Sequence, residues 1–312
     1  MRQFTFLLLG VLTAGITVSC ATVPQTQTGW TGPETIGRIE HAAIDESSGL
    51  ARSHRAADVY WTHNDSGGEP VLYAIDATGR FLGAVRVAGA SNIDWEDMTS
   101  FELDGTAYLL VAEVGDNFGQ RTDCVLHIIR EPDPADLNPA RELIWEIAWS
   151  IPVAYPAGPR DCEGVAVDVT ERTIYLISKR TKPPVVYRLP LQPDPAAPAP
   201  LAAVVGDLNG IPEPTGPSAL LNVPWGRYRA SPCAFDLSPD GRTAVVLTYG
   251  EVYIYQREGD ATWAETFAAD PLALAAHGLP QAESACFATD GRAVLVTTEG
   301  SPAPLLRYRP VD

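Results

Sequence analysis

The sequence is short of basic residues. It has 22 Lys and Arg against 39 Asp and Glu among 312 residues, which gives a formal net charge of −17. A surface of this sign repels phosphate backbones, so the composition argues against nucleic-acid binding. It is compatible with bound cations and with cationic partners.

The common signatures of catalysis and zinc binding are also missing. The sequence contains no GxSxG nucleophile elbow, no P-loop and no HExxH motif. Its five cysteines form no CxxC pair and its five histidines are scattered, so a zinc site is not indicated.

A long apolar run occurs only at the N-terminus, and it is too short for a stable membrane span. Residues 1–20 resemble a bacterial lipoprotein signal in which Cys20 is lipidated; the alternative is an ordinary secretory peptide. Ala21, rather than Asp, follows Cys20, and this pattern points to an outer-membrane lipoprotein that faces the periplasm. Residues 21–33 then read as a polar tether, and residues 34–312 as a single domain.

Stretches of helical hydrophobic period are scarce, whereas Gly (26) and Pro (27) are frequent, which is typical of short strands joined by turns. A search for internal repeats finds five similar segments rich in β-branched and aromatic residues. A short apolar run and a tight turn precede each of them, which predicts five hairpins. The five segments are DVYWTHND (58–65), TAYLLVAE (106–113), TIYLISKR (173–180), TAVVLTYG (243–250) and AVLVTTEG (293–300).

A third strand follows each hairpin, and a fourth follows in four cases. The fifth unit ends before its fourth strand, and the strand-like segment 34–40 is available to complete it. These units predict an all-β, five-bladed β-propeller closed by its N-terminal strand. The insertion 209–232 leaves a six-bladed propeller open as the alternative. The predicted fourth strands are 81–87, 143–151, 201–208 and 262–268.

Carboxylates recur where the first strand of a unit begins. Equivalent positions carry Ser48, Glu96, Glu163, Cys233 and Glu283. In a propeller these positions surround one mouth of the central channel, where carboxylates repel each other unless a cation binds. Oxygen-only ligands favour Ca²⁺, with Mg²⁺ possible; the alternatives are salt bridges or a solvated rim. The predicted metal ligands are Glu96, Glu163, Glu283, Glu46, Asp94 and Asp161.

The same face receives the residues that follow the second strands. Their acidic, amide and cationic side chains suit a small anionic or peptidic ligand beside the metal, although the same sequences are also good turns. The predicted ligand-binding residues are His63, Asn64, Asp65, Asp116, Asn117, Arg121, Lys179 and Arg180.

Four cysteines follow Cys20. Cys124 and Cys162 are expected near one face on neighbouring blades, so we predict a disulfide between them. Cys233 and Cys286 either bridge or remain small buried apolar groups.

The segments DESSGLARS, NIDWEDMTSFELDG and RDCEGVAVD…TIYLISKR resemble the bacterial envelope propellers of the SdiA-regulated family and, more loosely, phytase-like and esterase-like propellers. The resemblance covers residues 43–180. Calcium-activated nucleotidases are related in architecture and hold Ca²⁺ in the central channel, which implies the same role for Glu96, Glu163 and Glu283.

Besides a purely structural role in which the metal only holds the blades together, two functions follow as expectations. The first is a monomeric, lipid-anchored envelope module that binds Ca²⁺ and a small anionic or peptidic ligand or an envelope protein. The second is a metal-dependent hydrolase of phosphate or carboxylic esters, with one of the clustered carboxylates as base. Fold analogy does not decide between them.

Overall fold

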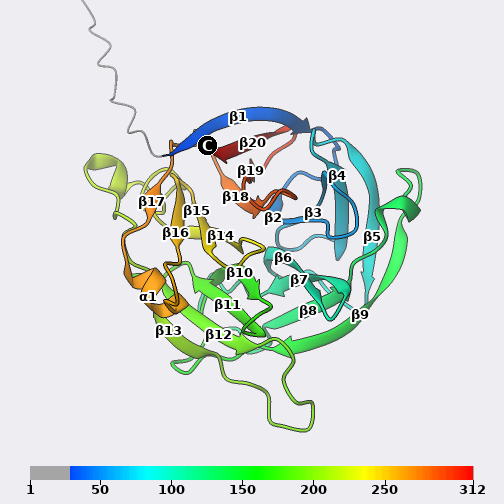
Figure 1. Cartoon of the computed structure of the whole chain (residues 1–312), viewed down its shortest axis with the longest axis horizontal. Helices are drawn as coiled ribbons and strands as arrows, with labels where there is room; N and C mark the ends of the chain where they lie inside the picture. The colour runs from blue at the N-terminus through cyan, green and yellow to red at the C-terminus, as the bar shows by residue number, and fades with distance from the viewer. Residues whose placement is uncertain (1–28, 312) are drawn as a thin grey trace, which may run out of the picture.

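The computed structural model describes residues 29–311. These residues form twenty β-strands, one short α-helix and two 3₁₀ turns, so the fold is nearly all-β as predicted. The strands form sheets around a common centre, an arrangement consistent with a β-propeller (Figure 1). The predicted signal segment, Cys20 and most of the tether lie outside the described residues. Within the described range, no helix has the length and hydrophobicity to cross a bilayer.

The first sheet has eight strands in the order β2-β3-β4-β5-β9-β8-β7-β6. It consists of two antiparallel four-stranded units joined by a parallel pairing of β5 with β9. The strands are β2 (Ser47–Arg52), β3 (Val59–Asn64), β4 (Val71–Asp76), β5 (Phe81–Ala88), β6 (Trp95–Leu103), β7 (Thr106–Glu113), β8 (Val125–Arg130) and β9 (Leu143–Pro152).

Two further sheets follow in chain order, each with four antiparallel strands. The first contains β10 (Cys162–Asp168), β11 (Thr173–Ser178), β12 (Val185–Pro190) and β13 (Ala203–Asp207). The second contains β14 (Pro232–Leu237), β15 (Thr243–Thr248), β16 (Val252–Gln256) and the two-residue β17 (Leu272–Ala273). The 3₁₀ turns are η1 (Pro134–Asp136) and η2 (Pro217–Leu220).

The last sheet joins the two ends of the described chain. Its order is β1-β20-β19-β18, with β1 (Trp30–Ile39), β18 (Ala282–Phe287), β19 (Val294–Thr298) and β20 (Ala303–Pro310). β1 pairs antiparallel with β20, from Trp30 opposite Pro310 to Ile39 opposite Ala303. The predicted closing strand 34–40 is therefore found, and it removes an open sheet edge.

One predicted strand is wrong. Residues 262–268 do not form a fourth strand but the helix α1 (Trp263–Ala268), and the short β17 takes the outer position. Thr262 and Glu265 form a capping box, which satisfies the first free N–H groups of the helix. Trp263 and Phe267 lie four residues apart and are both buried, so the helix packs one apolar face inward.

The apolar core lies between neighbouring sheets. Leu110 and Leu126 of the eight-stranded sheet, for example, belong to one buried cluster with Val165 and Leu176 of the next sheet. β11 is covered on both faces, because Ile174 and Leu176 belong to this cluster and Tyr175 and Ile177 to the next one. The insertion 209–231 contributes only η2 and contains no strand.

The centre of the molecule is polar instead. Asp97 of β6 is fully buried, and its carboxylate accepts the backbone N–H groups of Val165 (2.9 Å) and Phe235 (3.0 Å). Asp236 of β14 likewise accepts the N–H of Phe287 at 2.9 Å. These carboxylates link inner strands of different sheets through hydrogen bonds at the centre of the molecule.

Candidate functional site

A β-bulge occurs at the same place in all five inner strands. The pairing register shifts across Ser48 in β2, across Glu96 and Asp97 in β6, and across Glu163 in β10. The same shift occurs at Cys233 in β14 and at Glu283 in β18. A bulge adds an unpaired residue and redirects its side chain. The positions that the sequence repeat singled out are therefore the bulged residues.

Three of these bulged residues are glutamates that lie almost completely buried. Glu96 and Glu283 are 3 % exposed and Glu163 is 1 % exposed. Glu96 and Glu163 offer oxygen atoms within 4.8 Å of each other and of an oxygen of Asp161. Glu283 forms a similar group with Asp65 and Glu299.

A third group joins these two, because Asp65 and Glu96 also lie within this distance of Asp94. The three groups together form a continuous set of acids, which we call the carboxylate arc. Its members are Asp65, Asp94, Glu96, Asp161, Glu163, Glu283 and Glu299.

The arc contains five of the six predicted metal ligands. The sixth, Glu46, is exposed and belongs to none of the three groups. Asp65 was predicted on the ligand face rather than among the metal ligands. Glu299 was not predicted, although it follows β19 much as Asp65 follows β3.

A glycine makes the close approach of two of these acids possible. A Cβ atom at Gly115 would lie 2.1 Å from Oε1 of Glu96 and 2.5 Å from Cγ of Asp94. A side chain here would push both carboxylates away, so Gly115, just after β7, leaves the space that they use.

Lys179 is the cation at the centre of this site. Its Nζ lies 2.7 Å from Oε1 of Glu163 and 5.2 Å from the centre of the Tyr249 ring. The Tyr249 hydroxyl in turn donates a hydrogen bond to Glu283. Despite the ion pair, neither oxygen of Glu163 has a partner in hydrogen-bond geometry.

Burial and mutual repulsion raise the pKa of several carboxyls in the arc. Burial, opposed by Lys179, raises the pKa of Glu163 to about 8. Burial and the nearby Glu163 hold the pKa of Glu96 well above its usual range. Burial together with Glu283 raises the pKa of Asp65 to about 7 and that of Glu299 to about 8. Without a bound cation, burial and repulsion therefore disfavour the charged forms of these carboxyls near neutral pH.

The other two cations of the predicted ligand face are already paired. Arg180 contacts Asp161 through Nε at 2.5 Å and also bonds the side chain of Asn117. Arg121 contacts Glu113 at 2.7 Å and Asp123 at 3.0 Å. This arrangement leaves little cationic charge on that face for an anion.

The remaining predicted ligand residues have structural partners. His63 is fully buried, with its ring edge against Trp95 at a centroid distance of 5.4 Å. The Asn64 amide donates to the carbonyl of Ala43 at 2.8 Å. Asp116 accepts the backbone N–H groups of the turn that follows it, at Gln120 (2.8 Å) and Arg121 (2.9 Å).

The predicted Cys124–Cys162 disulfide is absent. Cys124, Cys162, Cys233 and Cys286, the cysteines of the described range, are free and buried. Cys124 and Cys162 do belong to one hydrophobic cluster, so the sequence placed them in the same region. Burial raises the pKa of the Cys124 thiol to about 11 and that of Cys162 further, which disfavours the thiolate that disulfide formation requires.

Comparison with known proteins assigns no family. No model of a known family and no curated protein matches the chain. A gluconolactonase from Xanthomonas campestris matches with a TM-score of 0.43 at 10 % identity, over 89 % of this chain and 95 % of its own. A luciferin-regenerating enzyme matches with a TM-score of 0.42 at 9 % identity, over the same shares of both chains.

The Raptor protein of Chaetomium thermophilum matches with a TM-score of 0.39 at 12 % identity, over 86 % of this chain. The matched region is 20 % of the Raptor chain, so this chain spans about a fifth of that protein. These similarities are too low to assign an activity to this chain.

Proposed function

We propose that the chain is a divalent-cation-binding β-propeller whose carboxylate arc holds Ca²⁺. The observation that supports this most directly is Glu163. It is 1 % exposed and lies among other acids, and the cation it contacts is the Lys179 ammonium at 2.7 Å. Burying Glu163 among other carboxylates is costly even with this ion pair, and a metal ion beside Glu163, Glu96 and Asp161 would offset that cost.

The chemistry of the donors favours Ca²⁺ over a transition metal. All members of the arc offer carboxylate oxygens, which suit hard cations. Each of the three groups offers three carboxylates from different strands and loops, an irregular donor set that suits the flexible coordination of Ca²⁺ better than the strict octahedron of Mg²⁺. Glu96, Asp161 and Glu163 are the proposed first ligands.

We also propose that the propeller has five blades. The inner strands contact one another in the cyclic order β2, β6, β10, β14, β18 and back to β2. The five equivalent bulges and the strand-free insertion 209–231 support this number over six.

The envelope location and lipid anchor at Cys20 remain part of the proposal, together with membership of the SdiA-regulated family. They are supported by the sequence of residues 1–20 and by the motifs within residues 43–180. A monomer bound to the membrane through that anchor, with a small ligand or an envelope protein as its partner, is the simplest form of this function.

The ion pairs of the site restrict how a ligand can bind beside the metal. Arg121 and Arg180 are occupied by acids, and Lys179 by Glu163. A free anion therefore has no unpaired cation among these three. We propose that a small anionic or peptidic ligand binds on this face only when a cation occupies the arc.

A second candidate function is a metal-dependent hydrolase of phosphate or carboxylic esters. The specific observation in its favour is the pKa of Glu163, which burial raises to about 8. A carboxyl with a pKa near the working pH can accept and return a proton. Loss of ester hydrolysis in Glu163→Gln, with the fold intact, would favour this candidate over a binding module.

The test is to measure binding of Ca²⁺ and Mg²⁺ to the purified, metal-depleted full-length chain by calorimetry, with thermal unfolding as a second readout. We expect saturable Ca²⁺ binding and a higher melting temperature. At a concentration 100 times the Kd, Ca²⁺ should stabilise the fold by about 2.7 kcal/mol.

Glu163→Gln should abolish this stabilisation. Glu102→Gln serves as the matched control, because Glu102 is exposed on β6 and lies outside the arc. Equal Ca²⁺ binding by wild type and Glu163→Gln, or no binding by either, would refute the metal site.

A further inference from the structure

A separate cavity of about 290 Å³ lies at the opposite end of the inner strands from the carboxylate arc. The arc lies where these strands begin, whereas the cavity is lined by residues near the ends of β2, β6, β10 and β14. Asp97 and Asp236 lie between the two. The lining residues that matter here are Arg52, His54, Ser100 and Asp168.

Arg52 is a buried cation whose donors are not used. The residue is 8 % exposed. Its ion-pair partner is Asp236, at 3.9 Å, which is too long for a hydrogen bond. No hydrogen bond from the Arg52 guanidinium to another part of residues 29–311 is found. A guanidinium has five N–H donors in a planar fork, so a buried one normally meets a matching acceptor.

The hydrogen-bond acceptors of the Asp236 carboxylate are occupied by groups other than Arg52. Its Oδ2 accepts the backbone N–H of Phe287 at 2.9 Å, and its Oδ1 accepts the N–H of Leu237 at 2.9 Å and the hydroxyl of Thr99 at 3.1 Å. The carboxylate is thus satisfied by two backbone N–H groups and a hydroxyl, while the guanidinium of Arg52 forms no hydrogen bond with it.

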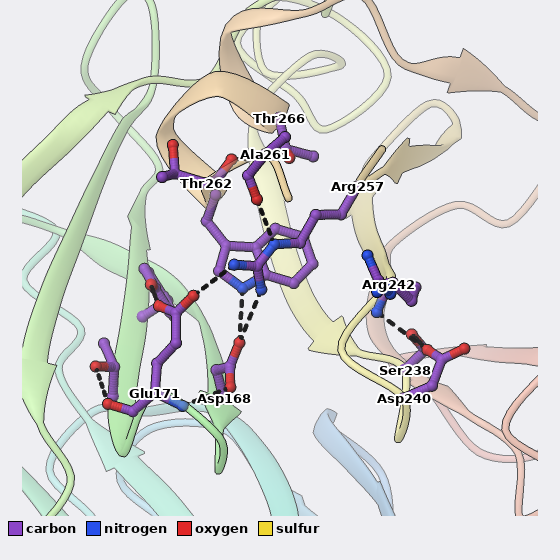
Figure 2. Close-up of polar contacts among 12 residues, drawn as sticks. Asp168, Glu171, Ser238, Asp240, Arg242, Arg257, Ala261, Thr262 and Thr266 are labelled. Carbon is purple, nitrogen blue, oxygen red and sulfur yellow. Dashed lines mark hydrogen bonds and ion pairs between the residues drawn. The ribbon is translucent and has the colours of Figure 1, made fainter. Parts of the chain in front are cut away.

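Asp168, the buried acid of the cavity lining, also has hydrogen-bond and ion-pair partners. Asp168 lies 3.3 Å from Nη1 of Arg257 and accepts the indole N–H of Trp263 at 2.9 Å (Figure 2). Arg257 further contacts Glu171 at 2.7 Å. The charge of Asp168 is therefore offset by Arg257. Glu102, the remaining acid of the lining, is exposed to solvent.

His54 lies beside Arg52 in the lining and adds no negative charge to it. Its Nε2 is buried and has no hydrogen-bond partner, while its backbone N–H bonds to Glu131 at 2.9 Å. Burial and the neighbouring Arg52 lower the pKa of His54 to about 4, so the ring is neutral at pH 7.

We propose that this cavity binds a small oxyanion, a carboxylate or a phosphate group, through the guanidinium of Arg52. Guanidinium binds both kinds of group through two parallel hydrogen bonds. The volume lies near the lower limit of ligand sites, about 300 Å³, so the ligand is a small molecule. The site does not depend on the metal proposed for the arc.

The test uses the metal-depleted full-length chain, prepared on a chelating resin because soluble chelators are themselves carboxylates. Acetate, succinate and inorganic phosphate are titrated by calorimetry, with acetamide as the neutral analogue of acetate. We expect saturable binding of at least one anion and none of acetamide. The comparison of acetate and succinate with phosphate identifies the preferred oxyanion.

Arg52→Gln should weaken that binding at least tenfold, whereas Arg188→Gln, at an exposed position on β12, should leave it unchanged. Ser100→Leu, which fills part of the cavity without altering Arg52, should also weaken binding. If Arg52→Gln does not fold, this second variant tests the proposal. Absence of saturable binding by all three anions, or unchanged binding in a folded Arg52→Gln or Ser100→Leu variant, would overturn the proposal. Binding that requires added Ca²⁺ would place the anion at the arc and overturn it equally.

Discussion

The Asp97 carboxylate on β6 accepts the backbone N–H of Phe235 on β14 at 3.0 Å, although these strands do not pair in any sheet. The same oxygen accepts the N–H of Val165 on β10 at 2.9 Å. The bulge that turns the neighbouring Glu96 into the arc thus also places Asp97 between inner strands. Adjacent acids of one strand have different roles: Asp97 connects the sheets, and Glu96 belongs to the proposed metal site.

Asp97→Ala should destabilise the fold strongly. The substitution removes the acceptor of three buried N–H groups, those of Met98, Val165 and Phe235. At about 1–3 kcal/mol each, we expect a loss of roughly 3–9 kcal/mol. Urea unfolding at neutral pH measures it. Glu102→Ala, at an exposed position of the same strand, should change stability by less than about 0.5 kcal/mol. Similar midpoints for the two variants would contradict the bridging role of Asp97.

Gly115→Ala should impair the arc while the sheets stay intact. The added methyl group would lie 2.1 Å from Oε1 of Glu96, so the Glu96 and Asp94 carboxylates must move apart. We expect Ca²⁺ affinity to fall at least tenfold, about 1.4 kcal/mol. Gly206→Ala is the control, because no atom lies within 4 Å of its added Cβ. Unchanged Ca²⁺ affinity in Gly115→Ala would show that Glu96 and Asp94 do not bind the ion together.

Lys179→Met should increase Ca²⁺ affinity, because Lys179 and the ion compete for Glu163. Nζ of Lys179 lies 2.7 Å from the Glu163 carboxylate, and like charges within several ångströms repel by a few kcal/mol near a protein surface. We expect roughly tenfold tighter binding together with lower stability of the metal-free chain. Calorimetry and thermal unfolding give the two values. Weaker Ca²⁺ binding in this variant would show that Lys179 organises the site rather than opposing it.

Acid should destabilise the protein partly through His54. The pKa of His54 is about 4 in the folded chain, because of burial and Arg52, against an ordinary value near 6.5. The folded state therefore takes up the proton less readily than the unfolded state. This contribution to stability is present above pH 6.5 and is lost as the pH falls towards 4.

Because His54 is only partly buried, we expect a loss of roughly 1–2 kcal/mol across that interval, and His54→Gln should remove it. Unfolding measured at pH 7, 5.5 and 4.5 gives the difference. NMR titration of the His54 ring gives its pKa directly, and a value near 6.5 would contradict the expectation.

The sequence predicts the strands of this fold well, because its repeat is local. The five hairpins can be aligned by their β-branched residues and turns, as in TIYLISKR (173–180), which contains β11. The closing strand β1 was predicted by elimination, since the last unit lacked a partner. The exception is residues 262–268, where the pair Thr262 and Glu265 is a capping-box signal that outweighs the apparent strand pattern.

The site could be predicted only in part. Glu96, Glu163 and Glu283 are visible in the sequence because they recur at one repeat position. The bulges at these positions depend on strand pairing and have no local signature. The pairing of Lys179 with Glu163 likewise depends on how far each side chain extends into the centre. Glu299 was missed because it follows the second strand, where acids are common in turns.

Trp30 lies opposite Pro310 in the sheet that contains both ends of the described chain. The eight strands β2 to β9 come from the first half of the chain, but β1 has no partner until β20 exists. A chain that is synthesised or translocated from its N-terminus must therefore keep β1 as an unpaired edge for nearly the whole process. Pairing of β1 with β20 is then the final event of folding. A chain that lacks β20 would leave β1 without a partner.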